Sequence, residues 1–70
     1  MLPDVVYIGE NLKKQRLRAA LSQIELADKA DLNRAAVNRI ERDKVEPHMR
    51  TVRKLAEALN IEPRLLTEGE

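Results

Sequence analysis

The feature that most constrains this fold is a pair of short, separately capped helical segments that lie close together in the sequence. Ser22 and Glu25 form a capping box, in which a serine precedes a helix and a glutamate follows three residues on, and the helix runs over 23–29. Asn33 is a good cap residue for a second helix over 34–42. About four residues join the two helices, too few for them to lie antiparallel along their length. They must therefore cross steeply, as in a helix-turn-helix.

The rest of the chain also has helical spacing, and no strand is predicted. Further helices are expected over 8–19, over 49–59 and, with a proline in its first turn, over 62–67. The predicted fold class is therefore all-α. The expected organisation is an N-terminal arm over 1–7, a single domain over 8–67 and a C-terminal tail over 68–70.

Length and composition exclude several classes of protein. A domain of 70 residues buries only about 60% of the surface that its unfolded chain exposes. There is no cysteine and a single histidine, His48, so we expect no disulfide, no metal site and no other cofactor. Burial against a partner subunit is the remaining support for so small a core.

The same survey bears on location and activity. No apolar run approaches the ~20 residues of a membrane span, and no signal-peptide pattern is present, so we expect a cytoplasmic protein. No pairing of catalytic groups is evident, so we predict neither an enzyme nor a small-molecule site.

The second helix of the pair carries side chains that can read DNA. When its apolar residues face the core, Arg34, Asn38 and Arg39 are left on the opposite face. Arginine can bond both acceptors on a guanine edge, and asparagine can bond an adenine edge in the same way. Residues 10–44 carry nine basic and six acidic side chains, a net charge of +3, which is a modest sign of an anionic partner. The alternative is an ordinary solvated helix face.

Three stretches resemble the lambda-repressor-like, or XRE, family of helix-turn-helix domains, and the likeness covers about residues 8–66. The stretches that carry it are LSQIELA at 21–27, NRAAVNRIER at 33–42 and LAEAL at 55–59. The resemblance implies a compact five-helix bundle in which the first helix of the pair braces the second across the major groove of double-stranded DNA. It also implies that Gln23 holds a phosphate and packs on the first recognition residue. The residues that we expect to face bases or phosphates are Gln23, Asn33, Arg34, Ala35, Asn38, Arg39, Arg42 and Lys44.

One arginine needs a structural explanation. Arg16 shares a helix face with Ile8 and Leu12, and a buried charge without a partner is costly. Members of the family pair an arginine of the first helix with a glutamate near the end of the third. The resemblance therefore implies an ion pair between Arg16 and Glu41.

The sequence departs from the family pattern at three turns. Ala20, Asp31 and Asp43 stand where many members have glycine. Aspartate tolerates the left-handed backbone conformation better than most residues, whereas alanine is more strained there. These departures concern stability more than function.

The last apolar residues have two interpretations. Ile61, Pro63, Leu65 and Leu66 can close the core, or some of them can form a two-fold dimer interface, as in many members of the family. The leading hypothesis is a transcriptional regulator, such as a repressor, that reads a palindromic operator as a homodimer. The alternative is an antitoxin or adaptor that acts mainly through protein contacts, with DNA binding secondary.

Overall fold

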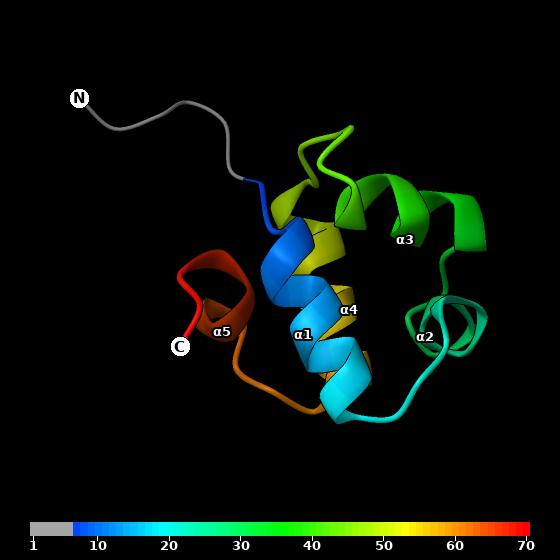
Figure 1. The fold of residues 1–70 in the computed structure, drawn as a ribbon, viewed down its shortest axis with the longest axis horizontal. Coiled ribbons are helices and arrows are strands. Elements are labelled where there is room, and N and C mark those ends of the chain that lie inside the picture. Colours follow the sequence, from blue (N-terminus) through cyan, green and yellow to red (C-terminus); the bar gives the residue numbers. More distant parts are fainter. Residues whose placement is uncertain (1–6) are drawn as a thin grey trace.

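The computed structural model describes residues 7–70, and within them the chain forms five helices and no strand (Figure 1). This confirms the predicted fold class. The predicted arm over 1–7 lies outside the described residues except for Tyr7. The last helix starts two residues later than expected, and Pro63 is its N-cap residue instead of lying inside its first turn. The helices are α1 (Gly9–Arg18), α2 (Gln23–Lys29), α3 (Arg34–Glu41), α4 (Met49–Leu59) and α5 (Arg64–Thr67).

Each helix contributes a fully buried aliphatic side chain to one core. These side chains are Leu12, Leu26, Val37, Leu55 and Leu66. Burying an aliphatic side chain of this size is worth about 1.5–3 kcal/mol, so the apolar faces account for the packing of these short helices. The side chain of Leu66 is covered by its own chain, which favours the core interpretation of this residue over the dimer interface.

The first four helices are each followed by a residue in the left-handed backbone region. Ala20, Asp31, Asp43 and Asn60 have φ angles of 56–58°. This conformation lets the chain reverse within one or two residues, and it costs a residue with a Cβ roughly 1–2 kcal/mol. The strain that the sequence predicts at Ala20 and at the two aspartates is therefore present.

The start of α1 is seated against the end of α3. The backbone N–H of Gly9 donates to Oδ1 of Asp43 at 3.0 Å. A Cβ at Gly9 would lie 2.5 Å from the carbonyl oxygen of Glu41, so only glycine permits this approach. Asp43 thus both turns the chain after α3 and anchors α1.

The residues after α5, over which the sequence predicts a C-terminal tail at 68–70, return to α1. Nε2 of Gln15 donates to Oε1 of Glu70 at 2.9 Å, and Arg18 forms an ion pair with the same carboxylate. Nδ2 of Asn11 donates to the carbonyl oxygen of Leu66 at 2.8 Å.

In the described residues, no helix has the length and apolar character that a membrane crossing requires.

Candidate nucleic-acid interface

Helix α3 is held so that one face is free. At its start, Oδ1 of Asn33 accepts a hydrogen bond from the backbone N–H of Ala36 at 2.7 Å, which satisfies one of the unpaired donors of the first turn. Val37 and Ile40 are buried beneath the helix. The positions on the other side therefore face solvent, and they are Arg34, Ala35 and Arg39, all exposed, and Asn38, half-buried.

Helix α2 packs against α3, and local hydrogen bonds fix both the start of α2 and the turn between the two helices. Oγ of Ser22 accepts from the backbone N–H of Glu25 at 3.0 Å, and the Glu25 carboxylate accepts from the backbone N–H of Ser22 at 2.8 Å. The hydrogen bond from the backbone N–H of Ser22 and, after it, the interaction with the Ser22 side chain hold the pKa of the Glu25 carboxyl below its usual value. After the helix, the backbone N–H of Leu32 donates to the carbonyl oxygen of Ala27 at 2.8 Å and closes the turn. The capping box predicted from the sequence is therefore present, and it sets where α2 begins.

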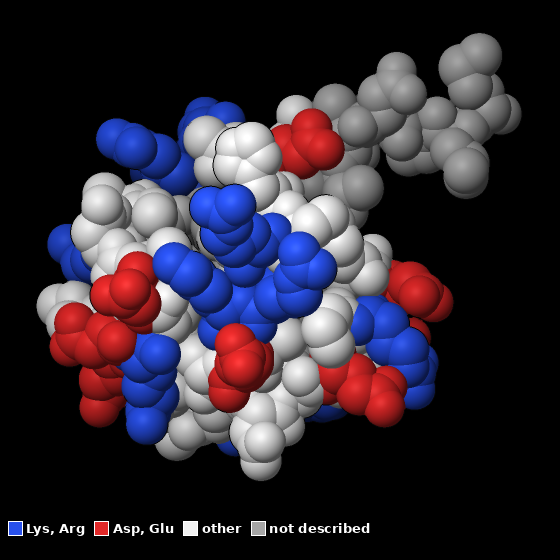
Figure 2. Space-filling model, turned by 180° about the vertical axis from the view of Figure 1, so that it is seen from behind, with Lys and Arg blue, Asp and Glu red and all other residues white. Residues whose placement is uncertain are grey.

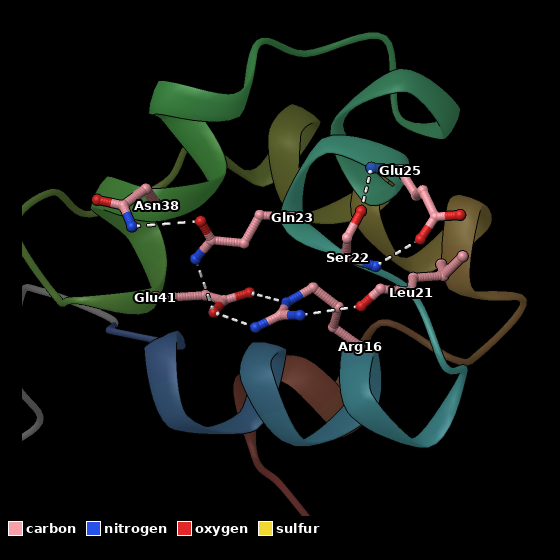
Figure 3. Close-up of polar contacts among 7 residues, drawn as sticks. All are labelled: Arg16, Leu21, Ser22, Gln23, Glu25, Asn38 and Glu41. Atoms are coloured by element: carbon pink, nitrogen blue, oxygen red, sulfur yellow. Dashed lines mark hydrogen bonds and ion pairs between the residues drawn. The ribbon is translucent and has the colours of Figure 1, made fainter.

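The ion pair that the resemblance implies is present beneath the corner (Figure 3). Nε and Nη2 of Arg16 donate to the two carboxylate oxygens of Glu41 at 2.6 and 3.0 Å, and Nη1 donates to the carbonyl oxygen of Leu21 at 2.9 Å. The two side chains are 10% and 4% exposed. The hydrogen bonds to Glu41 raise the pKa of the Arg16 guanidinium, against the lowering effect of burial. The pair ties α1 to the last turn of α3.

Gln23 extends this contact to the exposed face of α3. Its Nε2 donates to Oε1 of Glu41 at 3.2 Å, and its Oε1 accepts from Nδ2 of Asn38 at 3.3 Å (Figure 3). The resemblance places Gln23 against a phosphate and against the first recognition residue, Arg34, so the contact with Asn38 was not predicted. One signal was available: Asn38 and Glu41 are three residues apart, which puts both on one side of a helix.

The cations on and after α3 are available to an anionic partner. Arg34, Arg39, Arg42 and Lys44 are exposed, and none of them forms an ion pair with another residue in 7–70. Within the same span, no group of three or more side chains that could ligate a metal lies together. The surface therefore offers guanidinium, ammonium and amide groups and the small apolar Ala35.

Positive charge is also found on a second face. Figure 2 shows the molecule from behind, the side on which α4 lies in Figure 1, and lysine and arginine side chains gather near the middle of this view. The basic residues of α4 are Arg50, Arg53 and Lys54. Positive charge alone therefore does not distinguish α3 from the rest of the surface. What distinguishes α3 is the combination of arginine, asparagine and alanine on the exposed face of a helix that α2 supports.

Comparisons with known proteins agree with this geometry. A family model described as "Helix-turn-helix" matches residues 12–66. The immunity repressor protein of Bacillus phage phi105 is 38% identical over 55 residues, which cover 79% of this chain and 38% of the repressor. This chain thus spans well under half the length of that relative.

Solved structures resemble the chain over nearly all of its length. The restriction-modification controller protein C.AhdI from Aeromonas hydrophila has a TM-score of 0.83 and 40% identity, with 90% of this chain and 96% of that chain covered. The c2 repressor of P22, solved in complex with a synthetic operator, has a TM-score of 0.82 and 25% identity, with the same coverage. The chain belongs to the helix-turn-helix family, in its XRE, or lambda-repressor-like, branch.

Proposed function

We propose that this chain is a DNA-binding transcription regulator that reads a palindromic operator as a homodimer. The observation that carries the proposal is the outward face of α3, where Arg34, Asn38 and Arg39 lie on a helix braced by α2. A helix of this diameter fits the major groove of B-form DNA, where each base pair presents a distinct pattern of donors and acceptors.

Each residue of the interface has a role that its chemistry supports. Arg34 and Arg39 can each bond N7 and O6 of a guanine, and the methyl group of Ala35 can contact the methyl group of a thymine. Phosphates would be held by the side chains at the margins of the groove, and these are Gln23, Asn33, Arg42 and Lys44. Oδ1 of Asn33 is used by the helix cap, which leaves its amide N–H groups for a phosphate oxygen.

The dimer would use the region between α4 and α5. Ile61 and Leu65 are half-buried and Pro63 is exposed, so together they offer apolar surface that a second copy could cover. A two-fold arrangement would place two α3 helices in successive major grooves, about 34 Å apart. This spacing is the physical reason for expecting a palindromic operator.

The decisive experiment starts from selection of bound sequences out of a random duplex pool, followed by fluorescence anisotropy on the selected site. Loss of two base contacts in Arg34→Ala with Arg39→Ala should weaken binding at least about 30-fold, since each such contact contributes about 1–3 kcal/mol. The matched control, Lys29→Ala with Arg53→Ala, removes two exposed positive charges from other helices and should change affinity far less.

Salt dependence provides a second readout. Because phosphate contacts release counterions, affinity should fall steeply as salt is raised, and the slope should become shallower when Lys44 is replaced by alanine. Unchanged operator affinity in the α3 double variant would contradict the proposed reading face. A folded wild-type protein that binds no DNA at low salt would refute the proposal and favour an adaptor.

A further inference from the structure

We propose that Glu41 acts through Gln23 to set which end of the Asn38 amide faces the DNA. Asn38 would then present its oxygen atom to the base pair and select an exocyclic amino group. This inference rests on the proposed function, since it concerns how the reading face discriminates between bases. It makes Gln23 a positioning residue for specificity, in addition to any contact that it makes with a phosphate.

The first step is the direction of the hydrogen bonds at Glu41. A guanidinium has only donors, and Arg16 donates to both oxygens of the Glu41 carboxylate. Both oxygens therefore act as acceptors. Because this pair is buried and joined by two short hydrogen bonds, the carboxylate oxygens of Glu41 keep their role as acceptors whatever the solvent does.

The second step is the orientation that Glu41 gives to the side-chain amide of Gln23. An amide side chain has a donor end and an acceptor end, and only the donor end can lie favourably beside a carboxylate oxygen. Nε2 of Gln23 accordingly faces Glu41 at 3.2 Å, which turns Oε1 of Gln23 toward α3. That oxygen accepts from Nδ2 of Asn38 at 3.3 Å. In Figure 3 the oxygen of the Asn38 amide lies on the side away from Gln23.

The third step is what the exposed oxygen can recognise. In the major groove, adenine N6 and cytosine N4 are donors, whereas guanine O6 and thymine O4 are acceptors. An outward Oδ1 on Asn38 accepts from the amino groups and is repelled by the keto oxygens. The second N–H of the same amide remains free to donate to adenine N7, so adenine satisfies both ends. Every base pair carries one amino and one keto group in this groove. The amide orientation therefore selects the orientation of the base pair in which the amino group lies on the strand that Asn38 contacts.

The test uses base analogues in the operator obtained by selection. The base pair that Asn38 contacts is first located as the position where sequence preference disappears in Asn38→Ala. At that position, an analogue without the exocyclic amino group should weaken wild-type binding roughly five-fold or more, and one without the keto oxygen should change it less than about two-fold. The opposite ranking of the two analogues would overturn the inference.

A polarity change at position 23 sharpens the test. The ammonium introduced by Gln23→Lys has only donors, so it can pair with Glu41 and donate to Oδ1 of Asn38, which turns the amide around. The penalty should then move from the amino-deleted to the keto-deleted analogue. Gln23→Met removes the hydrogen-bond partner of the Asn38 amide, which can then adopt either orientation. The two analogues should therefore have similar effects. We call the chain of contacts from Glu41 through Gln23 to Asn38 the relay. An unchanged analogue ranking in Gln23→Lys, with the helical circular dichroism signal intact, would refute the relay.

These outcomes separate the two proposals. If the wild-type protein selects no DNA sequence, the proposed function fails. If it selects an operator but the analogues give the wrong ranking, the function stands and the relay fails. The wild-type measurement with the two analogues decides the question even when a variant at position 23 does not fold.

Discussion

The strongest prediction for stability concerns the buried pair of Arg16 and Glu41. The change Glu41→Ala removes the acceptor for two hydrogen bonds of 2.6 and 3.0 Å and leaves a guanidinium that is 10% exposed without its counter-charge. Breaking a buried pair in this way costs about 3–5 kcal/mol. We expect the lower end, about 3 kcal/mol, because Arg16 retains its bond to the carbonyl oxygen of Leu21.

That loss is large for a chain of this size. At roughly 0.05–0.15 kcal/mol per residue, 70 residues have a free energy of unfolding of about 4–10 kcal/mol. A loss of about 3 kcal/mol should lower Tm by roughly 12–24 °C, since 1 kcal/mol corresponds to about 4–8 °C in a small domain. Urea titration and thermal melting, both followed by circular dichroism, measure the two quantities.

A matched variant separates the cost of an orphaned charge from the cost of disturbing the site. Replacement of both partners, Arg16→Met with Glu41→Leu, removes the charge and fills the space with apolar atoms, so its stability should lie within about 1 kcal/mol of the wild type. A loss below about 1 kcal/mol in Glu41→Ala, the value typical of an exposed pair, would refute the reasoning.

Three further predictions are independent of that pair. Ala20→Gly relieves a left-handed alanine and should raise the free energy of unfolding by about 0.5–1 kcal/mol in urea titration; a lower value would contradict the assigned strain. The bonds from Ser22 lower the pKa of Glu25, so their contribution is present above the unfolded pKa and is lost as pH falls through the folded one. The difference in Tm between wild type and Glu25→Gln should therefore shrink as pH is lowered from 6 toward 3 (about the range in which glutamate titrates), and a constant difference would disprove it. Leu65→Asp should convert the proposed dimer to a folded monomer in sedimentation equilibrium, and an unchanged dimer mass would exclude the proposed α4–α5 interface.

Features coded by neighbouring residues were predictable from the sequence. The capping box of Ser22 and Glu25 and the cap at Asn33 involve residues three apart, so their spacing alone sets the start of two helices. The left-handed turns at Ala20 and Asp43 were expected from the resemblance, because many members of the family have glycine at those positions. The helix-turn-helix corner follows from these local signals.

Features that depend on distant contacts were not predictable in the same way. Helical periodicity marks an apolar face, but it does not say which apolar side chains reach the core: Leu66 is fully buried, whereas Ile24 and Met49 are more than half exposed. The contacts of Gln23 with Asn38, and of Glu70 with α1, join elements whose relative placement is decided only when the whole chain has packed. A family resemblance supplied the partner of Arg16, which spacing alone could not.

The way α3 is held has a consequence for how such a domain can change its target. The helix is secured by its cap at Asn33, its buried face and the contacts of its last turn, none of which involves the side chains at 34, 35 and 39. On the proposed reading face, those three positions can therefore be substituted one at a time, so that the preferred DNA site changes while the domain stays folded. Position 38 differs, because the amide of Asn38 is hydrogen-bonded to Gln23. A new base preference at position 38 therefore requires substitutions at both 38 and 23.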